Sequence, residues 1–320
     1  QPEFNLLRSQ SVKKSHIKLS EIYSEVIKYS LPMIFVGMAN ALFQLVDMLT
    51  FNSAMATIGL SSVSDLYLSM INFTTHKVVI IPVMLATGLS LALVPTITKY
   101  YTQGEIDLLR NAMDKTYQIL FFITLPAVVG ISLLSNEIYF ILYSESEMGA
   151  SVLAHYAPVA IFFALFQVTA ALLQGIDYQK WIVFSLLTGL LIKLMLNVPL
   201  IKVLQADGAI LATAIGYGVS ILINLVVLRK MLDYRSVMVK RRILLIGLLT
   251  LIMAISVFLV HQGLIAVMGT VEGKFSAIFV AVVCVGVGIV VYGLLAMRMG
   301  IAQKLLGERV TKIANKIGFK

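Results

Sequence analysis

Long apolar runs separated by short polar stretches cover most of the chain. A helix needs about 20 apolar residues to cross roughly 30 Å of hydrocarbon, whereas a barrel strand shows about 10 residues of alternating polarity. The runs fit helices. They predict an all-α, polytopic membrane protein with eight transmembrane helices, at about residues 30–51, 66–98, 117–142, 153–176, 181–203, 209–228, 243–268 and 275–297.

Lys and Arg flank these runs unevenly. The connections on one side hold only Lys202 and Lys274, and Lys77 and Lys193 fall inside expected spans. All other Lys and Arg residues lie in the alternate connections or near the chain ends. Because cytoplasmic loops are enriched in Lys and Arg, both ends of this chain are expected to be cytoplasmic, and an added or omitted helix would scatter the later clusters over both sides.

The composition excludes several functional classes. Hydrophobic residues make up 59% and charged residues 13%, too little polar surface for a soluble globule of this size. The net charge of +9 comes from residues that flank apolar runs, so it indicates topology and not a nucleic-acid partner. The single cysteine, Cys284, permits no disulfide framework or Cys/His metal cluster. No nucleotide-binding or catalytic motif is present, so we expect neither an enzyme nor a cofactor.

The two ends differ from the apolar middle. Residue 1 is Gln, and residues 1–21 have no apolar core that could serve as a signal peptide, so we expect a fragment that begins in a cytoplasmic linker, residues 1–28. Residues 299–320 place apolar side chains on one helical face among basic residues, which predicts an amphipathic cytoplasmic tail on the inner membrane surface. A solvated basic tail is the alternative.

Lys77 is the most informative polar residue within the spans. It lies in FTTHKVVIIPVMLATGLSLALVPTITKYY, residues 73–101. A lysine at mid-bilayer costs about 2.5 to 3.5 kcal/mol and normally faces a bundle interior or a water-filled cavity. Pro82 indicates a bend of the kind tolerated beside a cavity, so we expect Lys77 to face a lumen. In the alternative, the helix begins at Val78 and Lys77 reaches water from the outer flank.

Three further polar residues are candidates for substrate binding. Lys193 precedes Asn197 by four residues, so both lie on one side of a helix and share a polar contact. A lysine that locks neighbouring spans together is an equal alternative. Asp47 could be the anionic partner of a lysine, or an aspartate at the membrane interface. His76 is expected to be packed or hydrogen-bonded, and Glu137 to cap or flank a helix.

Four stretches together resemble the MOP (multidrug, oligosaccharidyl-lipid, polysaccharide) exporter superfamily, especially its polysaccharide-transporter and MurJ-like branch with the YtgP/SpoVB-like group. They are YSLPMIFVGMANALFQLVDMLTFN, HKVVIIPVMLATGLSLALVPTITKYY, LPAVVGISLLSNEIYFILY and IKLMLNVPLIKVLQADGAILATAIGYG. The resemblance covers nearly all of the chain after residue 20.

The resemblance implies a fourteen-helix transporter of two six-helix lobes and two extra helices. Residues 29–230 would then form the second lobe, and residues 231–298 the final helix pair, with a groove for a polyprenyl tail. The N-terminal lobe would be a missing partner. Lys77 falls where MurJ-like proteins carry a basic residue, expected to be arginine, that meets the substrate diphosphate. Lysine keeps the charge but lacks the bidentate fork of arginine.

These observations predict a flippase of the cell membrane. It would carry a polyprenyl-diphosphate-linked saccharide, expected to be lipid II, by alternating access, with membrane lipid and this saccharide as its partners. One alternative is a multidrug or cation antiporter of the same superfamily, which needs a deep acidic residue. The other is a membrane scaffold that recruits cell-wall enzymes.

Overall fold

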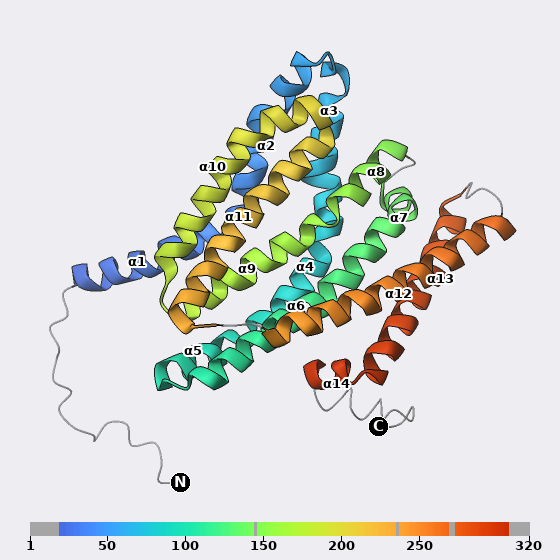
Figure 1. Ribbon diagram of the computed structural model, residues 1–320. Coiled ribbons are helices and arrows are strands. Elements are labelled where there is room, and N and C mark those ends of the chain that lie inside the picture. Colours follow the sequence, from blue (N-terminus) through green and yellow to red (C-terminus); the bar gives the residue numbers. More distant parts are fainter. Residues whose placement is uncertain (1–18, 144–145, 235–236, 269–272, 307–320) are drawn as a thin grey trace, which may run out of the picture.

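The chain is described from a computed structural model that covers residues 19–143, 146–234, 237–268 and 273–306. Within these ranges all regular structure is helical (Figure 1). The elements are α1 (Leu19–Gly37), α2 (Ala39–Thr57), α3 (Ser61–Ser69), the π-helix η1 (Met70–Thr75), α4 (His76–Leu91), α5 (Val94–Gln103), α6 (Ile106–Leu133), α7 (Ser135–Leu142), α8 (Glu147–Tyr156), α9 (Val159–Gly175), α10 (Gln179–Leu204), α11 (Ala206–Leu232), α12 (Val237–Met268), α13 (Lys274–Arg298) and α14 (Ile301–Leu306).

The helical class follows from the apolar runs. Lipid offers no hydrogen bonds, so a segment within it must pair its own backbone groups, which a helix does. The helices end where the sequence offers a suitable residue. After α5, Gly104 adopts a left-handed conformation (φ 73°), which glycine reaches without a Cβ clash.

Seven described segments are long and apolar enough to cross a membrane, and each overlaps one of the last seven expected spans. The first expected span, 30–51, coincides with the end of α1 and most of α2 but is not among the seven. Its apolar run is interrupted by Asn40, Gln44 and Asp47. The all-α membrane architecture is confirmed, and the count of eight spans stays a prediction.

The buried residues form two groups that meet at α6. The larger group joins α2, α4, α6 and α8 to α11, and includes Met113 and Leu120 of α6. The smaller group joins α12, α13 and α14 to the other side of α6 through Ile119 and Phe122. In Figure 1, α10 and α11 accordingly lie on one side of α6, and α12 and α13 on the other.

The chain ends are described in part. Residues 19–28 form the first turns of α1, within the region expected to be a linker. In the expected tail, Ile301, Ala302 and Leu305 of α14 are buried in the smaller core group. Residues 1–18 and 307–320 lie outside the described residues, so the predicted limits of the linker and tail remain predictions.

Candidate functional site

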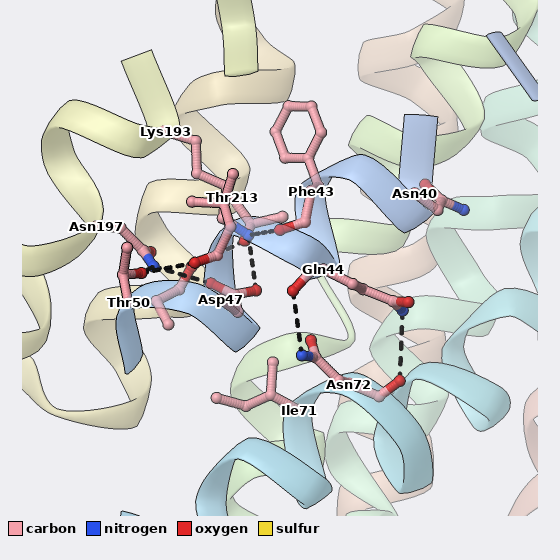
Figure 2. Close-up of polar contacts among 12 residues, drawn as sticks. Asn40, Phe43, Gln44, Asp47, Thr50, Ile71, Asn72, Lys193, Asn197 and Thr213 are labelled. Carbon is pink, nitrogen blue, oxygen red and sulfur yellow. Dashed lines mark hydrogen bonds and ion pairs between the residues drawn. The ribbon is translucent and has the colours of Figure 1, made fainter. Parts of the chain in front are cut away.

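A buried ion pair joins α2 to α10. The Lys193 side chain is fully buried, and its Nζ lies 2.7 Å from Oδ2 of Asp47 (Figure 2). The same ammonium donates a hydrogen bond of 2.7 Å to the backbone carbonyl of Phe43, one turn earlier on α2. The positive charge of Lys193 and the negative charge of Asp47 are thus paired inside the helix bundle, away from lipid.

Asn197 completes this cluster. Its Nδ2 donates to Oδ1 of Asp47 at 3.1 Å and to Oγ1 of Thr50 at 2.7 Å. Lys193 and Asn197 therefore occupy one carboxylate oxygen each, which confirms the shared helix face predicted from their spacing. Asp47 is 2% exposed, so in the structure it is the partner of a lysine and not an interfacial aspartate.

Small residues allow the neighbouring helices to approach this cluster closely. A Cβ added to Gly216 of α11 would lie 2.7 Å from the carbonyl oxygen of Gly189 of α10 and 2.8 Å from the Phe43 ring. Glycine is therefore required where α2, α10 and α11 meet. Close approach of backbones through small residues is the usual packing mode of helices in membranes.

A second polar contact ties α2 to η1. Nε2 of Gln44 donates to the carbonyl of Asn72 at 3.3 Å, and Nδ2 of Asn72 donates back to the carbonyl of Gln44 at 3.5 Å (Figure 2). The π-helical turn is supported by Thr75, whose Oγ1 donates to the carbonyl of Met70, five residues earlier, at 2.7 Å. Such π-helical turns are rare and occur often at functional sites.

Lys77 lies two residues after the end of this turn and makes no hydrogen bond or ion pair with Asp47 or Lys193. The helix runs without interruption from α3 through η1 into α4, so it does not begin at Val78. Lys77 is sixteen residues, or about 24 Å, from the first residue of α3. Its side chain is exposed, and no hydrogen bond or ion pair joins it to another described residue. The same exposed stripe carries the apolar residues Phe73, Ile81 and Met84.

His76 points to the other side of the helix, into the core. Its Nδ1 lies 3.0 Å from the hydroxyl of Tyr156, and its ring packs against Phe163 with 5.6 Å between ring centroids. This confirms His76 as a packed, hydrogen-bonded residue. His76, Asp47 and Lys193 border a hollow of about 10 Å³, room for one water at most.

A second buried acid was not recognised as such from the sequence. Glu137 lies in the first turn of α7 as expected, but it is only 6% exposed and its Oε1 lies 2.8 Å from Nε2 of His261 on α12. The pair joins α12 to α7. Nothing in the local sequence indicates a partner so far along the chain. Among the described residues, no cluster of three His, Cys, Asp or Glu residues is arranged to hold a metal.

The fold and the site together define a multi-pass α-helical membrane protein with charges paired inside the bundle and a lysine within a membrane segment, Lys77, that has no partner among the described residues. Ionisable residues within membrane-spanning helices are typical of transporters. The chain belongs to the family of the lipid II flippase MurJ, whose family model matches residues 5–286. The resemblance to the MurJ-like branch is thereby confirmed.

Individual relatives agree with this family. The lipid II flippase MurJ of Bacillus subtilis (strain 168) is 43% identical over 301 residues, which are 92% of this chain and 55% of that protein. The uncharacterized membrane protein YabM of the same organism is 24% identical over 217 residues, 68% of this chain and 40% of that protein.

Among solved structures, the lipid II flippase MurJ in an inward closed conformation has a TM-score of 0.65 at 16% identity. The match covers 91% of this chain and 57% of that one, and it shows a common fold. The chain thus spans about half the length of the relatives it matches.

Proposed function

We propose that the chain is part of a flippase that moves lipid II, a polyprenyl-diphosphate-linked saccharide, across the cytoplasmic membrane. The observation that carries this proposal is the 43% identity over 92% of the chain to a protein named as a lipid II flippase. The N-terminal lobe of the same transporter would be the partner that completes the cavity. Alternating movement of the two lobes would carry the substrate, as in other transporters built from repeats.

Lys77 is proposed as the diphosphate-binding residue. Its exposed ammonium has no partner among the described residues, although an intramembrane lysine normally has one. A diphosphate supplies the missing negative charge. The apolar residues on the same stripe would line the rest of the cavity wall. Exposure of this stripe in the described part fits a surface that the other lobe covers.

Lys193, Asn197 and Asp47 are proposed to act from inside the lobe. They contact one another in the structure, so a substrate would reach them only after α2 and α10 separate. Their contribution to substrate binding is then to hold α2 against α10, and thus to fix the wall of the cavity. This is the locking role that the sequence left open for Lys193.

The final helix pair supports the proposed lipid-tail groove. A groove of about 530 Å³ lies between α6, α12 and α13, with Pro126, Gly130, Val257 and Gly288 among its almost entirely apolar lining. Such a groove suits a polyprenyl chain that stays in the lipid while the charged head crosses. With both ends of the chain on the cytoplasmic side, movement of negative charge outward would be favoured by the membrane potential, by about 2.3 kcal/mol per charge per 100 mV.

An antiporter needs an acidic residue free to bind a proton or cation. Both oxygens of Asp47 are occupied, and Oε1 of Glu137 is paired with His261, although its Oε2 has no partner among the described residues. These contacts favour the flippase over the antiporter.

The function is tested with the full-length protein in liposomes. Fluorescent lipid II placed in one leaflet should become accessible in the other only in vesicles that contain the protein. A cationic drug trapped in the same vesicles serves as the control. Drug release coupled to a proton or sodium gradient, without movement of lipid II, would instead support the antiporter. If neither lipid II nor the drug crosses the membrane, the membrane-scaffold alternative is supported.

A further inference from the structure

A pocket of about 320 Å³ lies between the end of α1, the start of α2, the end of α4 and the second half of α9. It is separate from the ion pair: Asn40, which lines it, points away from Asp47 in Figure 2. Its polar lining consists of the side-chain amides of Asn40, Gln167 and Gln174, and no charged residue lines it. We call it the amide pocket.

The amides of this pocket have capacity to bind a ligand. Gln167 and Gln174 have no side-chain hydrogen bond to any described residue, and each offers two donors and one acceptor. They are seven residues apart, about two turns, so both project from the same face of α9. Asn40 accepts a hydrogen bond from Tyr217 through Oδ1, which leaves its Nδ2 donors free. Neutral donors and acceptors without charge suit hydroxyl and amide groups.

The amide pocket and Lys77 share one face of α4, about 21 Å apart along the helix. Leu91 in the pocket wall follows Lys77 on the same helix by fourteen residues, just under four turns, so both lie on one face. His76, which points into the core from a different side of α4 than Lys77, packs against Phe163 of α9, and Gln167 follows Phe163 by one turn, about 6 Å. Gln174 lies about 10 Å further toward the end where Lys99 and Lys180 are found.

We propose that the amide pocket binds the saccharide part of the lipid-linked substrate, while Lys77 holds the diphosphate. This rests on the proposed function and adds a site that selects for sugar. A saccharide joined to a diphosphate at Lys77 would extend along α9 past Gln167 toward Gln174. Its hydroxyl and amide groups would pair with the glutamine amides, and its apolar ring faces would lie against Leu91.

The test compares two lipids on the full-length protein in nanodiscs: lipid II, and undecaprenyl diphosphate without sugar. The double variant Gln167→Leu/Gln174→Leu keeps side-chain size and removes the amides. Affinity for lipid II should fall about tenfold, the effect of one or two neutral hydrogen bonds, and affinity for the sugar-free lipid should not change. Gln103→Leu, at the exposed end of α5, is the matched control and should leave both affinities unchanged.

The outcomes separate this inference from the proposed function. Unchanged lipid II binding by the double variant, or equal loss for both lipids, would overturn the saccharide site and leave the flippase proposal intact. If the unmodified protein binds neither lipid, the flippase proposal itself fails, and the saccharide site with it. Retained binding of the sugar-free lipid shows that the variant is folded. The milder Gln174→Asn should give a smaller loss for lipid II alone.

Discussion

The Asp47–Lys193 contact shows what a buried charge requires of its surroundings. Each charge loses its hydration, and the loss is compensated only if partners are close and well oriented. Here the carboxylate receives Lys193 and Asn197, and the ammonium also reaches the carbonyl of Phe43. Removal of either charge alone leaves the other buried without a counter-charge, which costs more than the pair contributes.

Asp47→Ala should therefore lower the stability of the protein by about 3 to 5 kcal/mol. The double variant Asp47→Leu/Lys193→Met removes both charges and should recover most of this loss. Thermal unfolding of the purified protein in detergent measures both effects. A single variant as stable as the unmodified protein, or a double variant less stable than the single one, would contradict the locking role.

At the scale of elements, the contact between α10 and α11 depends on glycine. A Cβ on Gly189 would lie 2.0 Å from Oγ of Ser220 and 2.4 Å from the carbonyl oxygen of Gly216. The second of these atoms is backbone and cannot rotate away. The two helices would have to separate, and α10 would move relative to α2 and the ion pair.

Gly189→Ala should destabilise the protein by roughly 1 to 3 kcal/mol, the usual cost of overpacking. Gly218→Ala is the matched control on α11, because its added Cβ would meet Phe162 at an ordinary 3.6 Å. It should be neutral, or stabilising by about 0.5 to 1 kcal/mol, since alanine favours helix over glycine. Equal melting temperatures for the two variants in detergent would show that α10 and α11 do not pack tightly at Gly189.

The groove between α6, α12 and α13 makes a separate prediction about lipid tails. Gly130 lines the groove, and a Cβ added there has open space within 4 Å. Gly130→Phe should partly fill the groove without disturbing the fold. Flipping of lipid II with a long polyprenyl chain should then slow about tenfold, from lost apolar contact of one or two methylene groups. Flipping of a short-chain analogue should slow less. Equal slowing for both lipids would show that the groove does not bind the polyprenyl chain.

At the scale of the whole molecule, hydropathy predicted most of the architecture. An apolar run of sufficient length has few alternatives to a membrane helix, so seven of the expected spans match long helices. The spacing of Lys193 and Asn197 likewise fixed their common face. Asp47 was a candidate partner of a lysine, but which lysine it contacts could not be deduced, because it lies 146 residues away from Lys193 and pairing between helices leaves no periodic signal. For the same reason His261 was not recognised as the partner of Glu137.

Two features at this scale depend on packing that the sequence does not encode locally. The π-helical turn at Met70–Thr75 has no distinctive residue pattern, although it ends two residues before Lys77. The amide pocket is formed by residues from helices that are distant in sequence, so it could not be deduced from the sequence alone.

Membrane orientation is a further prediction for the whole molecule. The distribution of Lys and Arg places Lys202 outside and Lys180 inside. In a full-length variant without other cysteines, Lys202→Cys should react with a membrane-impermeant thiol reagent in intact cells, and Lys180→Cys only after the membrane is opened. The reverse pattern would invert the proposed direction of transport relative to this chain.

The central claim is that the Lys77 ammonium binds the substrate diphosphate within the membrane. The most direct measurement is the rate of lipid II flipping by the full-length protein in liposomes. Lys77→Ala should slow flipping about ten- to a hundredfold, as expected for the loss of a charged hydrogen bond, and Lys77→Glu should abolish it. Lys77→Arg should retain most activity, and Lys202→Glu, a charge reversal at an exposed helix end, should retain all of it. Unchanged flipping by both Lys77→Ala and Lys77→Glu would contradict the account.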